Sequence, residues 1–245
     1  MVLPSRIFRD GLESADFGKW TGTSVSAGDS LTVVKTKGFV HHGGYSGYAK
    51  SDGSAVPEWA YCYRNITGRA SLHCRMYIKY YDNGLVAAGD TATTYFCEFQ
   101  GTQAVAFFGV RNVAGAIVWR VACRNAAAYV TLNSTLTLNN RQWYCVEGRW
   151  LEDAANGGVW LWVDGKLILS LTGYDTNDYG DATQVRCGLP ETINLPVATQ
   201  MAFDCVIVDD VYIGLESPLR QLTRMGHRGV KTISVARSMQ GLSLK

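Results

Sequence analysis

Proline and long apolar runs are both scarce in this chain. Only 5 of its 245 residues are proline, and no run approaches the ~18 apolar residues that a membrane-spanning helix needs. The first residues include no apolar stretch of the kind that a signal peptide requires. We therefore expect a soluble chain with no membrane insertion, which reaches an extracellular surface only by an unusual route or as part of a particle.

Closely spaced cysteine pairs are also missing, because the 7 cysteines are spread singly and form no CxxC motif. This spacing excludes a zinc ribbon and a redox-active dithiol. Single cysteines within β-like segments are typical of small buried hydrophobic residues. The odd number leaves at least one thiol free or paired between chains. The seven are Cys62, Cys74, Cys97, Cys123, Cys145, Cys187 and Cys205.

Acidic residues are absent after Glu216, whereas the same segment contains several basic ones. This change of composition divides the chain into a body, residues 1–215, and a basic C-terminal arm, residues 216–245. The arm is predicted to act in assembly, with other copies of this chain or a coat or appendage protein as partner. Nucleic-acid binding is disfavoured, because no motif or stacking platform accompanies the charge. The assembly residues are Arg220, Arg224, Arg228, Lys231 and Arg237.

No segment has a convincing helical period of 3.6 residues, apart from a short turn near residues 218–224. Most apolar segments are short, rich in β-branched or aromatic residues, and bounded by Gly, Asn, Asp or Ser. Between Leu72 and Tyr80 the apolar residues alternate, which is typical of a half-buried antiparallel sheet. The body is therefore predicted to be a single all-β sandwich of about a dozen strands.

One hairpin is predicted with particular clarity. The apolar segments Val159–Val163 and Lys166–Leu169 flank Asp164 and Gly165. An Asp-Gly pair favours a type I′ turn, because glycine takes a positive φ freely and aspartate tolerates one.

Four other segments accompany this hairpin in the order Phe8–Trp20, His42–Ala49, Asn140–Glu147 and Cys205–Gly214. Together they resemble the laminin-G-like and concanavalin-A-like jelly-roll domains, over about residues 7–214. The resemblance implies an all-β, antiparallel jelly-roll β-sandwich followed by a C-terminal extension. This superfamily includes lectins, glycan-binding modules and a minority of polysaccharide-cleaving enzymes.

The resemblance also implies a structural calcium ion. In many related jelly rolls an aspartate of the closing strand and an acidic residue near the start hold Ca²⁺ together with backbone carbonyls. Carried over, these ligands are Asp209 and Glu13, with carbonyls near Gly43–Gly44, and calcium prefers such oxygen donors. The alternative is that both acids are paired or solvated.

No recognisable catalytic pattern is present. The E-x-D-x-E strand of the superfamily's glucanases is absent, and so are the Arg, Gln-x-His and Tyr sets of its alginate lyases. Glu147 and Glu152 would lie on opposite faces of a regular strand, and Glu98 is a lone acid among aromatic residues. His41 and His42 are adjacent in a Gly-rich loop. Because two neighbours cannot both bind one metal from a strand without strain, they are interpreted as loop residues. The sequence therefore predicts that this protein is not an enzyme.

Glycan binding needs fewer groups, because aromatic rings stack on sugar rings and a few polar groups fix the orientation. Tyr80, Tyr81 and Asp82 border a turn and are the candidate surface residues for a sugar. Trp160 and Trp162 share a face of one strand, which is interpreted as the core face.

These observations favour a non-catalytic surface module. It is expected to bind glycans or to decorate a larger particle, such as a virion or an appendage, at an extracellular surface. One alternative is a polysaccharide lyase or glycoside hydrolase. Another is a purely structural coat protein without a ligand.

Overall fold

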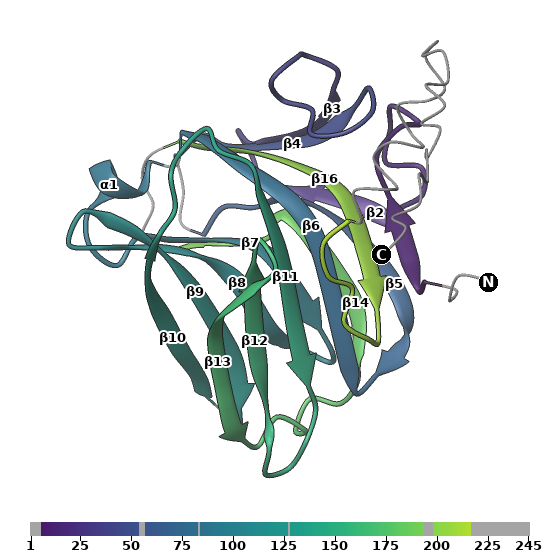
Figure 1. The fold of residues 1–245 in the computed structure, drawn as a ribbon, viewed down its shortest axis with the longest axis vertical. Helices are drawn as coiled ribbons and strands as arrows, with labels where there is room; N and C mark the ends of the chain where they lie inside the picture. Colours follow the sequence, from purple (N-terminus) through teal and green to yellow (C-terminus); the bar gives the residue numbers. More distant parts are fainter. Residues whose placement is uncertain (1–5, 54–56, 83, 127, 194–197, 217–245) are drawn as a thin grey trace, which may run out of the picture. The chain divides into compact units, whose positions relative to one another are not determined.

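The computed structural model describes residues 6–53, 57–82, 84–126, 128–193 and 198–216. The chain divides into two compact units, Met1–Gly214 and Leu215–Lys245. The described residues of the first unit form two antiparallel sheets and one short helix, α1 (Leu85–Ala88) (Figure 1). All five assembly residues of the C-terminal arm lie outside the described residues, so the arm and its boundary stay predictions.

The two sheets each contain eight strands. The first sheet has the order β13 (Lys166–Tyr174), β12 (Gly157–Val163), β11 (Tyr144–Leu151), β6 (Ser71–Asp82), β16 (Thr199–Asp209), β4 (Ser46–Ser51) and β3 (Ser30–Val34), with β1 (Phe8–Asp10) paired to β16. The second sheet has the order β10 (Ala128–Thr137), β9 (Ala116–Asn125), β8 (Ala104–Val113), β7 (Thr93–Gln100), β14 (Ala182–Leu189), β5 (Ala60–Arg69) and β2 (Gly22–Val25), with β15 (Thr192–Ile193) paired to β7.

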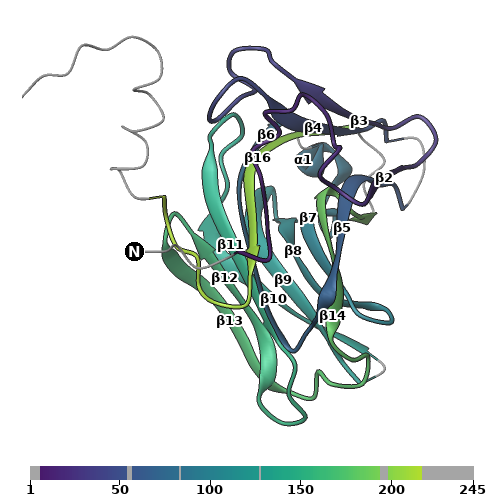
Figure 2. The ribbon, with the colours of Figure 1, turned by 90° about the vertical axis from the view of Figure 1, so that its right-hand side faces the viewer.

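The sheets pack face to face as a sandwich, with β11, β12 and β13 in one layer and β5, β7 and β14 in the other (Figure 2). This arrangement confirms the predicted all-β, antiparallel sandwich. Each sheet therefore has an inner face, which forms the core, and an outer face. Among the described residues, no helix is both long and apolar enough to span a membrane.

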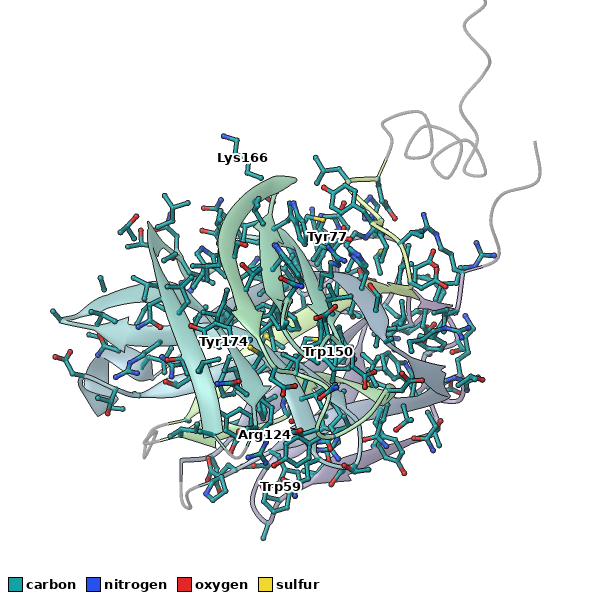
Figure 3. The ribbon with its side chains drawn as sticks, turned by 90° about the horizontal axis from the view of Figure 1, so that it is seen from below. Trp59, Tyr77, Arg124, Trp150, Lys166 and Tyr174 are labelled. Carbon is teal, nitrogen blue, oxygen red and sulfur yellow. The ribbon has the colours of Figure 1, made fainter. Side chains whose placement is uncertain are left out.

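The hydrophobic core lies between the inner faces and contains large aromatic side chains from both sheets. Trp119 and Trp150 are almost fully buried, as are Phe96, Phe99 and Phe108. All seven cysteines are buried as well, which confirms their interpretation as small hydrophobic residues. In Figure 3, Tyr77 of the first sheet and Arg124 of the second lie on opposite sides of the buried Trp150.

The hairpin of β12 and β13 forms as predicted, since Asp164 and Gly165 have φ angles of 50° and 77°. Its tryptophans, however, lie on the outer face. Val159, Leu161 and Val163 belong to the core cluster, so the alternation of the strand turns Trp160 and Trp162 outward. The interpretation of these two as core residues is wrong, because β-branched and aliphatic neighbours occupy the inner positions.

Candidate functional site

A β-bulge in β7 places two polar side chains on the outer face of the second sheet. Phe96, Cys97 and Phe99 all belong to the core cluster, whereas Tyr95 belongs to a separate outer cluster. The register with β8 shifts between Tyr95 and Cys97. Residues three apart on a regular strand point to opposite faces, but the extra residue of the bulge turns both Tyr95 and Glu98 outward.

Tyr95 is held by an arginine from β9, the second strand along. The Nε of Arg120 donates a hydrogen bond to the Tyr95 hydroxyl at 3.3 Å, and its Nη1 donates to Asn133 at 2.9 Å. Gly109 of β8 lies between them in register. A Cβ there would come within 2.6 Å of the Tyr95 ring and 2.3 Å of the Thr94 carbonyl oxygen. The absence of a Cβ at Gly109 therefore lets the Tyr95 ring lie close to β8.

Glu98 is paired with an arginine from the neighbouring strand. Arg186 of β14 lies directly opposite Glu98, and its Nη1 is 2.9 Å from Glu98 Oε1. The side-chain Nε2 of Gln100 also donates a hydrogen bond to this carboxylate. Burial nevertheless raises the pKa of Glu98 to about 7, although Arg186 acts to lower it. A carboxyl group with such a pKa can gain or lose a proton near neutral pH.

Aromatic rings continue from Tyr95 across the sheet. The Tyr95 and Phe107 centroids are 4.7 Å apart, and those of Phe107 and Tyr129 are 5.4 Å apart. The Arg124 guanidinium lies 4.3 Å from the Tyr129 ring centroid and 4.6 Å from that of Tyr179. Such an aromatic strip provides the apolar surface on which sugar rings stack.

At its other end this face opens into a polar hollow with a volume of about 430 Å³. Gln100, Gln184, Arg186 and Asn65 contribute to its lining. The side chain of Gln184 makes two hydrogen bonds here. Its Nε2 donates to Asn65 Oδ1 at 2.8 Å, and its Oε1 accepts the Arg186 Nε–H at 2.7 Å. These contacts fix amide groups at the mouth of the hollow, where hydroxyl groups of a ligand could bind.

We call the outward-facing side chains of the second sheet the arginine face. It carries an excess of positive charge, and Arg residues are well suited to bidentate binding of carboxylates. Its aromatic strip and guanidinium groups together fit a ligand made of sugar rings that carry negative charge. Its charged members are Arg111, Arg120, Arg124, Arg186, Glu98 and Glu191.

The sugar-binding residues predicted from the sequence lie elsewhere. Tyr80 is fully buried, so its predicted surface position is wrong: β6 continues to Asp82, and Tyr80 stays on the inner face with Ile78. Tyr81 lies on the outer face of the first sheet and stacks on Phe39 at 4.0 Å. Burial raises the pKa of Tyr81 to about 12. The side chain of Asp82 lies outside the described residues.

The two predicted calcium ligands have separate protein partners. Both carboxylate oxygens of Glu13 accept the Gly44 amide, at 3.1 and 3.0 Å. Asp209 is buried and forms an ion pair with Arg6, while its other oxygen accepts the Asp210 amide at 2.9 Å. The positive charge of Arg6 neutralises Asp209 without a metal ion. Calcium at this pair therefore stays a prediction.

Two of the acids considered for hydrolysis, Glu98 and Glu147, lie on different sheets. Glu147 lies on β11 of the first sheet, 2.8 Å from His73 Nδ1, and accepts the amides of Ile213 and Gly214. Glu98 lies on the second sheet. The pKa of Glu152 is raised to about 7 by burial and by the neighbouring Asp181. Glu98 and Glu147, on opposite sheets, cannot flank one glycosidic bond.

Three groups of side chains within the described part of the chain have ligand atoms close enough together to hold a metal ion. One is an acidic group in which the carboxylates of Asp29 and Glu58 already accept backbone amides, and one consists of three cysteines in the core. The third lies on the outer face of the first sheet and is considered below. The groups are Asp29, Asp52 and Glu58; Cys74, Cys97 and Cys187; and His41, His42 and Cys205.

The arginine face was not among the sites predicted from the sequence, although one signal for it was present. Arg120 follows Trp119 and precedes Val121, and Arg186 lies between Val185 and Cys187. A single arginine in an otherwise apolar strand must point away from the core, because an unpaired buried charge is costly. Two such strands in one sheet would have indicated a basic outer face.

Comparison with known proteins identifies the fold but no family. No family model matches this chain, and no curated protein matches its sequence. Among solved structures, it is similar to an endo-β-1,4-glucuronan lyase from the fungus Trichoderma reesei, with a TM-score of 0.65 and 13% identity over 84% of this chain and 96% of that one. It is also similar to the cellulose-induced protein Cip1, with a TM-score of 0.62 and 14% identity over 85% of this chain and 99% of that one. The binding domain of Paraclostridial Mosquitocidal Protein 1 gives a TM-score of 0.51 and 12% identity, over 91% of this chain and 52% of that one.

These neighbours confirm the sandwich fold, whereas membership of one particular superfamily is not shown. They also correct the prediction that this protein is not an enzyme. The glucuronan lyase has the same type of sandwich, and its match extends over 84% of this chain. The fold is therefore one that a polysaccharide lyase uses. The prediction rested on the absence of the glucanase and alginate-lyase patterns, and the match in fold does not depend on either pattern.

Proposed function

We propose that this protein binds an acidic, uronate-containing polysaccharide across the arginine face and cleaves it by β-elimination. The observation that carries the proposal is the Arg120–Tyr95 hydrogen bond on the same outer face as the Glu98–Arg186 ion pair. The similarity in fold to a glucuronan lyase supports the choice of a uronate as substrate.

Elimination on a uronate requires three functions. A base removes the proton from the carbon next to the carboxylate, and that electron pair forms a carbon–carbon double bond. The bond to the glycosidic oxygen then breaks, and an acid protonates the leaving oxygen. The carboxylate must be neutralised throughout, because negative charge accumulates next to it in the transition state.

The arginine face offers one group for each function. Arg120 neutralises the uronate carboxylate. Glu98, with a pKa of about 7, accepts the proton, since a base works best when its pKa is near the operating pH. Burial raises the pKa of Tyr95, so its hydroxyl remains protonated and can donate to the leaving oxygen. Hydrolysis would instead need two carboxylates flanking the bond.

The proposal is tested by a substrate screen with the full-length chain. Glucuronan, alginate, polygalacturonate and hyaluronan are the acidic probes, and cellulose and a mixed-linkage β-glucan are the neutral ones. Ultraviolet absorbance reports the double bond of an elimination product, and reducing-end assays report any cleavage. We expect absorbance to increase with at least one acidic polymer and with neither neutral polymer.

A matched pair of variants locates the activity on this face. Arg120→Lys keeps a positive charge but loses the planar guanidinium. Arg149→Lys makes the same change on the first sheet, where Arg149 lies 4.4 Å from the Trp160 ring centroid. Activity should fall in the first variant and persist in the second. Equal activity in both variants, or no reaction with any acidic polymer, would contradict the proposal.

A further inference from the structure

Two adjacent histidines and a cysteine come together on the outer face of the first sheet. His41 and His42 belong to the connection between β3 and β4, which is irregular rather than a strand. Cys205 lies in β16, at a shift in register between Asp204 and Ile207, and it has a φ of 52°. The loop position predicted for both histidines is therefore confirmed, and the strain that adjacent ligands would meet on a strand does not arise here.

One carboxylate holds the backbone of all three residues. Asp204 Oδ2 accepts the His41 and His42 amides at 3.1 and 2.9 Å, and Asp204 Oδ1 accepts the Cys205 amide at 2.6 Å. Asp204 is fully buried. The connection is thus fixed against β16 by the protein itself, before any ligand binds.

The rings of the histidines are also positioned. The His41 ring stacks on Tyr77, with centroids 3.7 Å apart and planes 19° from parallel, and lies 5.1 Å from the Trp143 ring. The His41 and His42 rings are 4.3 Å apart. Pre-organised side chains lose little conformational entropy when they bind an ion.

The donor atoms of the three side chains all lie within 4.8 Å of one another. In a tetrahedral zinc site the Zn–N and Zn–S bonds are about 2.0–2.1 Å and 2.3 Å long, so neighbouring donors are about 3.3–3.6 Å apart. Rotations that bring the donors together by about 1.5 Å or less would complete this arrangement. Two imidazoles and one thiolate are ligands that favour zinc and cobalt over calcium or magnesium.

We propose that His41, His42 and Cys205 form a three-ligand site for a divalent transition metal of the zinc type, with a fourth position for water. The bound metal would tie the β3–β4 connection to β16. Binding deprotonates the Cys205 thiol, so affinity falls as pH is lowered. The site lies on the first sheet, and neither its existence nor its test depends on the proposed activity of the arginine face.

The test is a cobalt titration of the untagged, full-length chain, reduced with a phosphine that does not chelate metals. Tetrahedral Co²⁺ with a thiolate ligand gives intense visible bands and a charge-transfer band at shorter wavelength. We expect both in the wild type, and displacement of both by Zn²⁺. Cys205→Ser should lose the charge-transfer band, and His42→Gln should weaken Co²⁺ binding by more than about tenfold.

The matched control is Cys145→Ser, because Cys145 belongs to the same outer cluster as Cys205 but is not one of the three ligands. Its Co²⁺ spectrum should equal that of the wild type. Circular dichroism of each metal-free variant checks its folding, and if Cys205→Ser does not fold, His42→Gln carries the test. The proposal is overturned if the wild type gives no tetrahedral Co²⁺ bands. It is also overturned if these bands persist in both Cys205→Ser and His42→Gln, or if they disappear in Cys145→Ser.

Discussion

Arg120 on β9 and Tyr95 on β7 are joined by a 3.3 Å hydrogen bond that passes over Gly109 of the strand between them. Because Tyr95 is almost fully buried and Arg120 nearly so, the two side chains hold one another in fixed positions. A guanidinium and a phenol fixed in this way are pre-organised for charge that develops on a bound substrate. This relationship is the basis of the function that we propose.

Tyr95→Phe removes the proposed proton donor but keeps the ring. We expect the kcat for polyuronate cleavage to fall by at least about 10²-fold with little change in KM, because the hydroxyl acts in the transition state. Initial-rate kinetics on the best acidic polymer measure both parameters. Tyr212→Phe is the control and should leave both unchanged, because Tyr212 lies after the end of β16, with its ring 5.3 Å from that of Trp162 in the first sheet. A Tyr95→Phe enzyme with normal kcat would exclude this hydroxyl as the donor.

Glu98 should control the pH dependence of the activity. Its carboxyl group must be ionised to accept a proton, and its pKa is raised to about 7 by burial. The rate should therefore rise as the pH increases through about 7. A pH profile of kcat/KM checks this, and Glu98→Gln should abolish the rising limb together with most of the activity. A profile that declines over this range would contradict the assignment.

The same carboxyl group should make stability depend on pH. The folded-state pKa of about 7 is above the ordinary glutamate value of 4.5, so the folded chain binds more protons than the unfolded chain between these two pH values. Its contribution to the free energy of unfolding is present below the unfolded pKa and is lost as pH rises to the folded one. Urea unfolding at about pH 5 and about pH 8 measures the free energy of unfolding of the wild type and of Glu98→Gln, which has no titrating group at this position. The wild type should lose stability relative to Glu98→Gln as the pH rises from the first value to the second. If the difference in unfolding free energy between the two proteins is the same at both pH values, the pKa of Glu98 is not raised.

Gly109→Ala should reduce both stability and activity. The added Cβ would lie 2.3 Å from the Thr94 carbonyl oxygen and 2.6 Å from the Tyr95 ring, so the strands or the ring must shift. Overpacking of this kind costs about 1–3 kcal/mol. Gly44→Ala is the control, because its Cβ would meet only Glu13, at an ordinary 3.6 Å. Thermal melting of both variants measures the effect, and equal melting temperatures would contradict the close approach of β7 and β8.

The sequence was informative about the fold because its signals are local. Alternation predicts β6, and the Asp164–Gly165 turn predicts the β12–β13 hairpin, each from residues that are neighbours in the chain. The site depends on information of another kind. The bulge between Tyr95 and Cys97 has no marker such as glycine, and the partners Arg120 and Arg186 come from strands far along the chain.

Face assignment failed where two faces were equally plausible. Trp160 and Trp162 alternate with Val159, Leu161 and Val163, and both sets are hydrophobic enough for a core. The structure selects the aliphatic set, and Arg149 covers Trp160 on the outer face. For Tyr80, the alternation from Leu72 onward already indicated the inner face, and its position near a turn was the weaker signal.

The basic arm yields a prediction that is independent of the site. If residues 216–245 act in assembly, the full-length chain should form larger species than a chain that ends at Leu215. Size-exclusion chromatography with light scattering compares the two masses. Two equally monomeric species would contradict the role in assembly, while the arginine face would be unaffected.

The most direct test of the central claim is the mass of the oligosaccharides released from glucuronan by the wild-type chain. β-Elimination adds no water, so each product with a new non-reducing end should be one water molecule lighter than the corresponding hydrolysis product. We predict this lighter series in the wild type and its loss in Arg120→Lys. Products with the full hydrolytic mass, or no products from any acidic polymer, would contradict the account.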